Sequence, residues 1–141
     1  MRVFIGMECS QVIHGTEGQR VKIQFAVFGV CYSMKNSKTI STRGGRPRII
    51  KNAKATAFER DFLLQVPAEY RNLALGSPAK PLSATVTAFY PSRRQDLDVS
   101  LVYDLLQKAG VVKNDRYIQR KLEIWGLDAE EPRVEIVLEE L

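Results

Sequence analysis

Three aspartates have the type and spacing to hold a divalent metal ion. Asp96 and Asp98 stand two residues apart, just ahead of an apolar stretch with helical periodicity, and Asp115 follows that stretch. Carboxylates held close together repel and raise one another's pKa, and a divalent cation between them removes this penalty. Ligand sets made only of oxygen favour magnesium, with manganese as a substitute, over zinc. The three aspartates therefore predict a Mg²⁺ site of the kind that activates water for phosphodiester hydrolysis.

A simpler interpretation of Asp96 and Asp98 stays open. Acidic residues ahead of a helix also cap its first turn and complement its dipole, and spacing alone favours this role because the DxD pattern is common. The metal site needs residues 95–98 to be extended, so that both carboxylates point to one side. It also needs the chain to turn at Gly110 so that Asp115 returns near the start of the helix.

Basic residues are concentrated in the first part of the chain. Residues 1–60 carry eleven Lys and Arg against three Asp and Glu, a balance of +8 in a protein whose net charge is +5. No acid interrupts the segment 35–54, and such a block needs either a polyanion or solvent around it. The alternatives are a phosphate-binding surface and a solvated loop. Candidate contacts to a DNA backbone are Lys35, Lys38, Arg43, Arg46, Arg48 and Lys51 in this block, and Arg93, Arg94, Lys113 and Arg116 near the aspartates.

Composition excludes several other classes of protein. Cys9, Cys31 and His14 are the only cysteines and histidine, too few and too scattered for a zinc site. No apolar run approaches the length that crosses a bilayer, and no signal peptide is recognisable. At 141 residues the chain is expected to form one domain, located in the cytoplasm.

The periodicity of apolar residues predicts the order β, α, β, α, β, β. This order indicates an α+β (α/β-like) fold, a single domain with one mixed sheet flanked by two main helices. Residues 1–20 form an N-terminal extension or hairpin, with a short strand at 2–5. We expect strands at 21–28, 82–90, 117–125 and 133–138, and helices from Ala53 to Pro67 and from about Asp98 to Ala109. Residues 29–51 are expected to be a long irregular connection, and 126–132 a turn.

Three motifs resemble the RusA family of Holliday junction resolvases. They are the run YPSRRQDLD at 90–98, QKAGVV at 107–112 and NDRYI at 114–118. Lys121, Trp125 and the run PRVEI at 132–136 add to the resemblance, and GRPR at 45–48 is similar to the arginine-rich loop of a phage-type member. The resemblance covers residues 21–138 and is strongest between 90 and 118, so that 21–141 would be a RusA-like endonuclease domain.

The resemblance implies a homodimer that binds four-way junctions or other branched DNA and cuts two strands symmetrically with Mg²⁺, without an organic cofactor or a membrane. The family's catalytic, metal-binding aspartates correspond to Asp96, Asp98 and Asp115. The chain departs from the family where Val99 replaces an asparagine and Val102 stands near the position of a catalytic lysine. Either Lys108, Lys113 or Arg116 replaces that lysine, or turnover is slow.

These departures keep other functions in consideration. A catalytically weak or inactive protein that binds branched DNA is the alternative, and an RNA-binding protein or ribonuclease is a third hypothesis. Tyr32 and Tyr90 are candidates for stacking on opened bases, although the strand position of Tyr90 favours the core. The dimer surface is expected either on an edge strand or on the face of the first helix, which carries Phe58, Phe62 and Leu63.

Overall fold

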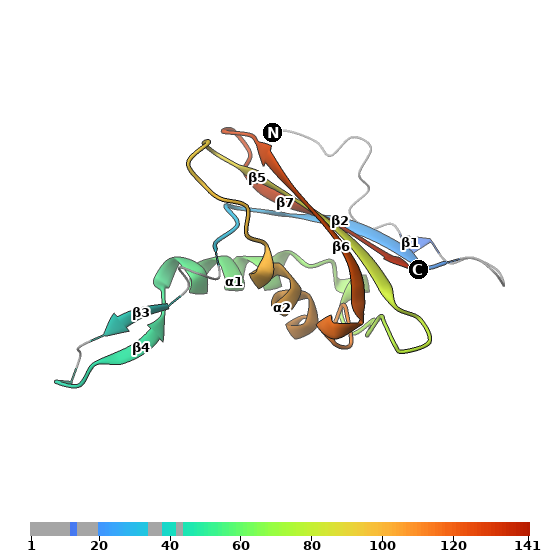
Figure 1. The fold of residues 1–141 in the computed structure, drawn as a ribbon, viewed down its shortest axis with the longest axis horizontal. Helices are drawn as coiled ribbons and strands as arrows, with labels where there is room; N and C mark the ends of the chain where they lie inside the picture. The colour runs from blue at the N-terminus through green and yellow to red at the C-terminus, as the bar shows by residue number, and fades with distance from the viewer. Residues whose placement is uncertain (1–11, 14–19, 34–37, 42–43) are drawn as a thin grey trace.

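A five-stranded mixed sheet forms the centre of the molecule, and both main helices cover the same face of it (Figure 1). The computed structural model describes residues 12–13, 20–33, 38–41 and 44–141. The sheet order is β1-β2-β7-β5-β6, in which only β5 and β6 are parallel neighbours. The expected α+β fold is confirmed. The strands are β1 (Val12–Ile13), β2 (Lys22–Phe28), β5 (Leu82–Tyr90), β6 (Ile118–Leu127) and β7 (Arg133–Glu140).

The sequence predicted an irregular basic connection after β2, and this prediction is wrong. It contains β3 (Lys38–Ser41) and β4 (Arg48–Lys51), which pair antiparallel as a separate two-stranded sheet. Both strands carry β-branched residues, and Gly44 and Gly45 take positive φ angles of 84° and 81° in the turn between them. The hairpin projects away from the sheet and helices as an arm (Figure 1).

Helix α1 (Ala53–Gln65) begins where the sequence predicts and ends two residues before Pro67. The Asn52 side chain accepts a hydrogen bond of 2.8 Å from the backbone N–H of Lys54, which caps the first turn. Phe58 and Phe62 are buried against the sheet, with 6% and 0% of their surface exposed. The expectation that they could form a dimer surface is therefore wrong, because they line the core of the single chain. The short 3₁₀ helix η2 (Ala68–Tyr70) follows.

Helix α2 (Ser100–Lys108) connects the two parallel strands β5 and β6. Val102 is fully buried, so this position faces the core rather than a solvent-exposed site. The helix ends before Gly110, whose φ of 79° is accessible to glycine. The 3₁₀ helix η3 (Asp115–Tyr117) then leads into β6. β6 runs on to Leu127 through the predicted start of the turn, and β7 extends to Glu140.

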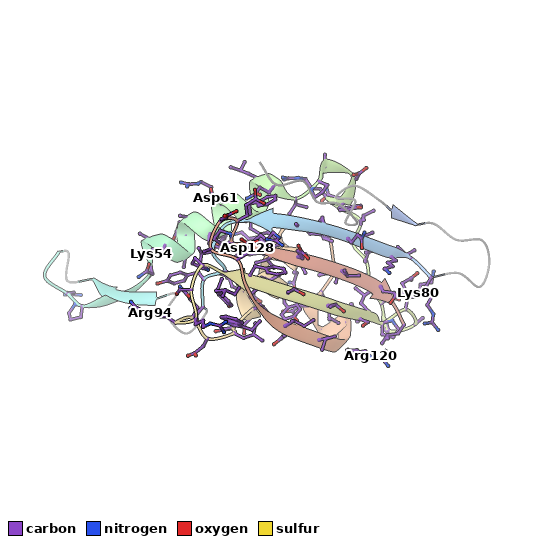
Figure 2. All side chains as sticks on the ribbon, turned by 90° about the horizontal axis from the view of Figure 1, so that it is seen from above. Lys54, Asp61, Lys80, Arg94, Arg120 and Asp128 are labelled. Carbon is purple, nitrogen blue, oxygen red and sulfur yellow. The ribbon has the colours of Figure 1, made fainter. Side chains whose placement is uncertain are left out.

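The directions of the strands make the two ends of the sheet different. Because β7 is antiparallel to both β2 and β5, and β6 is parallel to β5, the strands β2, β5 and β6 all run the same way. Their carboxyl ends, at Phe28, Tyr90 and Leu127, therefore meet at one end of the sheet, which we call the carboxyl edge. Figure 2 shows Lys54 and Arg94 at this end and Lys80 and Arg120 at the opposite one. Among the described residues, no helix has the length and apolar character needed to cross a bilayer.

Candidate functional site

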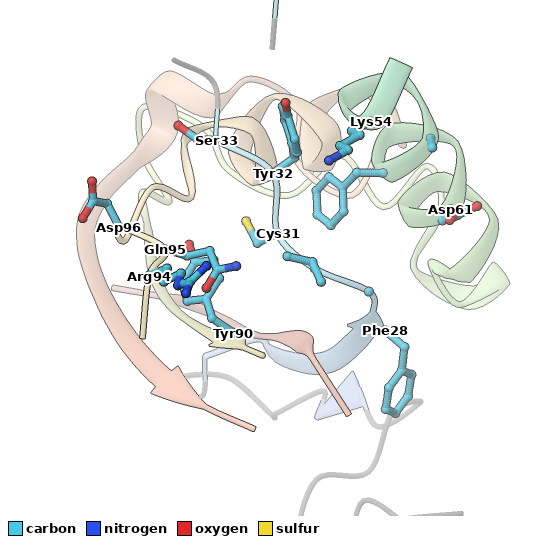
Figure 3. A pocket seen from close by; sticks show the side chains of 14 residues that line it. Phe28, Cys31, Tyr32, Ser33, Lys54, Asp61, Tyr90, Arg94, Gln95 and Asp96 are labelled. Carbon is cyan, nitrogen blue, oxygen red and sulfur yellow. The ribbon is translucent and has the colours of Figure 1, made fainter. Parts of the chain in front are cut away.

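A cavity of about 680 Å³ opens at the carboxyl edge of the sheet (Figure 3). It lies between the loop after β2, the first turns of α1 and the loop 91–99 that joins β5 to α2. Tyr32, Phe58 and Tyr90 contribute aromatic rings to its wall, and Cys31 lies in its middle. Ligands of open α/β sheets commonly bind beyond the carboxyl ends of parallel strands, so this is the expected place for a functional site.

Two exposed cations line this cavity from different elements. Lys54 comes from the first turn of α1 and lies beside Tyr32, whereas Arg94 comes from the loop 91–99 and lies beside Gln95 (Figure 3). Within the part of the chain that the structure describes, neither side chain has a hydrogen-bond or ion-pair partner. A pair of cations with free donors is suited to hold an anion such as a phosphodiester.

Asp98 is held by hydrogen bonds from two loops. Its Oδ1 accepts from the backbone N–H of Ser100 at 3.1 Å and from the Ser100 hydroxyl at 2.7 Å, while Oδ2 accepts from the Ser33 hydroxyl at 2.7 Å. The first two bonds satisfy Ser100, the first residue of α2, but the N-cap residue is Val99, which makes no side-chain cap bond, so the sequence prediction that Asp98 caps the helix is off by one residue. The bond from Ser33 also ties the loop after β2 to the start of α2.

Asp96 is the unpaired member of the aspartate pair. Its carboxylate is exposed at the rim of the cavity and points away from Cys31 (Figure 3). It has no hydrogen-bond or ion-pair partner in the described ranges, and neither Arg93 nor Arg94 forms an ion pair with Asp96 or Asp98 there. Within the described ranges, Asp96, Arg93 and Arg94 therefore stay available to other groups.

Asp115 lies at the other end of α2. Its backbone N–H donates a hydrogen bond of 2.9 Å to the side chain of Gln107, near the end of the helix, whereas Asp98 is bonded to Ser100 at the beginning. Between Ser100 and Gln107 the helix rises about 10 Å, far more than the roughly 4 Å between two oxygens on one Mg²⁺ ion. A single chain thus brings Asp96 and Asp98 to the carboxyl edge and leaves Asp115 away from it. Consistent with this, the described residues contain no group of three or more His, Cys, Asp or Glu placed to hold a metal.

This position of Asp115 follows from strand pairing. β6 begins at Ile118, which pairs with Leu82 at the amino end of the parallel strand β5. η3 precedes Ile118 directly, so Asp115 is placed at the edge opposite to the cavity. The sequence predicted that the chain turns at Gly110 and brings Asp115 back to the start of α2. This would require a reversed segment after Gly110, and the single chain does not form one.

The basic candidates fall into three groups. Lys38, Arg48 and Lys51 lie on the β3–β4 arm and Arg46 is exposed in its turn, while Lys35 and Arg43 lie outside the described residues. The side chains of Arg93 and Arg94 line different hollows. Arg94 lines the main cavity, and Arg93 lines a more open hollow beside Leu127 and Asp128. Lys113 and Arg116 are exposed near Asp115, where Arg116 packs 5.0 Å from the centre of the Tyr117 ring.

The family resemblance put forward Lys108, Lys113 and Arg116 as replacements for a catalytic lysine. None of the three lies beside Asp96 or Asp98. Lys108 forms an ion pair with Glu59 near the end of α2, and Lys113 and Arg116 follow that end. Lys54 is a cation on the same cavity as Asp96; the sequence places it at the end of the basic segment 35–54, but it was not among the candidate DNA contacts. The available signal was its place two residues after the cap Asn52, which fixes it in the first turn of α1.

The floor of the cavity is chemically inert near neutral pH. Burial, with a smaller contribution from the charge of Asp98, raises the pKa of the Cys31 thiol to about 12. Burial likewise raises the pKa of Tyr90 to about 12. Both groups therefore stay protonated, and neither is a nucleophile. Tyr90 stacks on Trp125 with ring centres 6.1 Å apart, which assigns it to the core as the strand pattern favoured.

Comparison with known proteins adds no relative. No protein-family model matches the chain, and no curated protein matches its sequence.

Proposed function

We propose that the protein is a Mg²⁺-dependent, structure-selective endodeoxyribonuclease of the RusA kind, which resolves Holliday junctions by paired symmetric nicks as a homodimer. The observation that carries the proposal is the juxtaposition at the carboxyl edge. There, the loop with Asp96 and Asp98 adjoins a cavity lined by Lys54 and Arg94, two cations without partners in the described ranges. The projecting basic arm adds a second surface for backbone phosphates (Figure 1).

The donor set of the loop suits Mg²⁺. This ion is commonly bound by one or two carboxylates, with waters and substrate phosphates completing its coordination. Asp96 offers a carboxylate without a partner among the described residues, and Asp98 offers one that hydrogen bonds from Ser33 and Ser100 fix in place. When bound, Mg²⁺ would supply an activated water and would neutralise charge on the leaving oxygen. Mn²⁺ is expected to substitute for it.

The side chains around the loop would position the DNA strand. Lys54 and Arg94 bind the phosphates next to the scissile bond and stabilise the charge that develops there, the role that the missing lysine has in the family. The Tyr32 ring, which lines the same cavity, offers an apolar surface for a base unstacked at the crossover. The bonds from Ser33 and Ser100 hold Asp98 in one orientation throughout.

A branched-DNA-binding protein with weak or no catalysis is the second candidate. Val102 is buried where the family has its lysine, and Asp115 lies at the far end of α2. Both observations favour binding without cleavage.

A cleavage assay distinguishes the two candidates. Labelled four-way junction, linear duplex, flap and duplex RNA are incubated with Mg²⁺ or Mn²⁺, with and without EDTA. The nuclease proposal expects paired nicks in the junction that EDTA abolishes. Junction binding without any product under either metal would leave only the binding protein, and equal affinity for duplex RNA would contradict both.

A further inference from the structure

The tip of the β3–β4 arm presents Arg46 and Pro47 to solvent. These two residues, and Gly44 and Gly45 before them, are all exposed in the turn between the two strands. Within the part of the chain that the structure describes, Arg46 has no hydrogen-bond or ion-pair partner. A Cβ added at either glycine would meet no atom within 4 Å, so the space beside both glycines is open. The tip is therefore narrow, and the guanidinium of Arg46 is available to a ligand.

The charges of the arm do not balance one another. Lys38 stands opposite Lys51 in the strand register, and Ser41 stands opposite Arg48. Like charges directly opposite each other destabilise an antiparallel pair, and residues 35–58 contain no acid that could offset the repulsion. A two-stranded hairpin by itself is at best marginally stable in water. A polyanion along the arm would remove the repulsion, so the arm is suited to lie against DNA.

The arm leaves the body of the molecule beside the cavity at the carboxyl edge. β4 ends at Lys51, and α1, whose first turn carries the cavity residue Lys54, begins at Ala53. Figure 2 shows the arm at the end of the sheet where Lys54 and Arg94 lie. Four residues of strand span about 13 Å, the length of about four base pairs of duplex. A duplex with one phosphate at the cavity and its axis along the arm would therefore present a groove to the tip about four to six base pairs away.

The residues of the arm favour the minor groove over the major groove. The minor groove of B-DNA is about 6 Å wide, and a turn with two glycines is narrow enough to enter it. The negative potential of a narrow minor groove attracts arginine. Proline is one of the apolar side chains that minor-groove proteins insert between base steps, and its missing N–H leaves no donor unsatisfied there. β3 and β4 contain no Asn, Gln, Asp or Glu, the residue types that pair with adenine and cytosine in the major groove.

We propose that the arm inserts its tip into the minor groove of a duplex arm of the substrate, with Arg46 in the groove and Pro47 wedged at a base step, and that the duplex bends there. Wedges of this kind kink DNA by about 20 to 90°. The bend brings more of the duplex against the body, and it favours flexible pyrimidine–purine steps such as TA, because the energy of bending depends on sequence. This role of the arm depends on the proposed function only for the identity of the duplex as part of branched DNA.

Competition by groove-binding compounds tests which groove the tip enters. Binding to a four-way junction whose arms contain A·T-rich segments with TA steps is measured by fluorescence anisotropy in EDTA. Distamycin, which occupies the minor groove, is expected to weaken binding, whereas methyl green, which occupies the major groove, is expected to leave it unchanged. The Arg46→Ala/Pro47→Ala double variant should bind more weakly and lose its sensitivity to distamycin. Any other pattern of displacement by the two compounds, or equal sensitivity of the double variant, overturns the proposal.

A bending measurement isolates the role of Pro47. Fluorophores at the two ends of a short duplex with a central TA step report its end-to-end distance by energy transfer, and the unsubstituted chain should shorten this distance. Pro47→Ala should lose most of the shortening with an unchanged melting temperature, because the arm forms its own sheet. Pro78→Ala is the matched control, since Pro78 is an exposed proline in the turn that carries Lys80 at the opposite end of the sheet (Figure 2). Bending by Pro47→Ala that equals bending by Pro78→Ala overturns the wedge.

Both measurements are made without cleavage, so they also separate this inference from the proposed function. A chain that bends duplex DNA through Pro47 but cuts no junction keeps the inference and loses the nuclease. A chain that cuts junctions, and whose binding is insensitive to distamycin, keeps the nuclease and loses the inference.

Discussion

The hydroxyl of Ser33 donates a hydrogen bond of 2.7 Å to Oδ2 of Asp98, and so connects the loop after β2 with the loop that leads into α2. The other carboxylate oxygen accepts from the backbone N–H and the hydroxyl of Ser100, the first residue of that helix. Asp98 thus has a structural role that any test of its chemistry must keep intact.

Asn is the substitution that meets this requirement. Its Oδ1 can still accept from Ser100, so Asp98→Asn is expected to fold, to bind a four-way junction and to lose Mg²⁺-dependent cleavage. Asp98→Ala loses the hydrogen bonds to Ser33 and Ser100 as well, and its free energy of unfolding should fall by about 1 kcal/mol. Cleavage and binding are measured by gel assays, and stability by denaturant titration. Undiminished cutting by Asp98→Asn would remove this carboxylate from the mechanism.

Lys54 and Arg94 are expected to contribute phosphate contacts. Lys54→Ala and Arg94→Ala should each weaken junction binding and lower the slope of log K against log salt by about 0.9 for a duplex arm. Lys80→Ala is the control, because Lys80 is an exposed lysine at the opposite end of the sheet (Figure 2). The measurement is fluorescence anisotropy at several salt concentrations. A slope that changes as much for Lys80→Ala would show a general charge effect instead of a contact.

The free energy of unfolding should decrease at alkaline pH. The pKa of Cys31 rises from 9.0 to about 12 on folding, and that of Tyr90 from 10.0 to about 12. Both groups hold their protons more tightly in the folded state, so their contribution is complete below pH 9 and is lost as the pH rises towards 12. Denaturant titrations across this range measure the slope, and Cys31→Ala should reduce it. A Cys31 thiol that reacts with an alkylating reagent at pH 8 as fast as in unfolded protein would contradict its burial.

Lys108 is expected to stabilise the fold without contributing to cleavage. Its ion pair with Glu59 joins the two helices; the lysine is 60% exposed but the Glu59 side chain only 11%, so Lys108→Ala takes a partner from a buried carboxylate and should cost about 1 kcal/mol. Its cleavage rate should equal that of the unsubstituted chain under the same conditions. A large loss of cleavage with unchanged junction binding would instead make Lys108 the replacement for the family's lysine.

Local sequence signals located most of the elements and fewer of the relationships between them. The cap at Asn52 and the alternation through residues 82–90 fixed α1 and β5, because capping and side-chain periodicity are local properties. The arm was missed because two strands of four residues each have a weak pattern in a strongly basic segment. The position of Asp115 depends on β6 pairing with Leu82, a contact between distant parts of the chain that no local pattern encodes. Lys54 and Arg94 line one cavity because distant segments of the chain pack together, and no local pattern encodes this contact either.

The β3–β4 arm forms its own small sheet and adds no strand to the central one. Its sequence is therefore under little pressure from folding, and under the proposed function it can vary with the shape of the nucleic acid that the arm would bind. An arm transplanted from another protein of this architecture should change which branched structures are preferred, while the melting temperature of the body stays nearly the same.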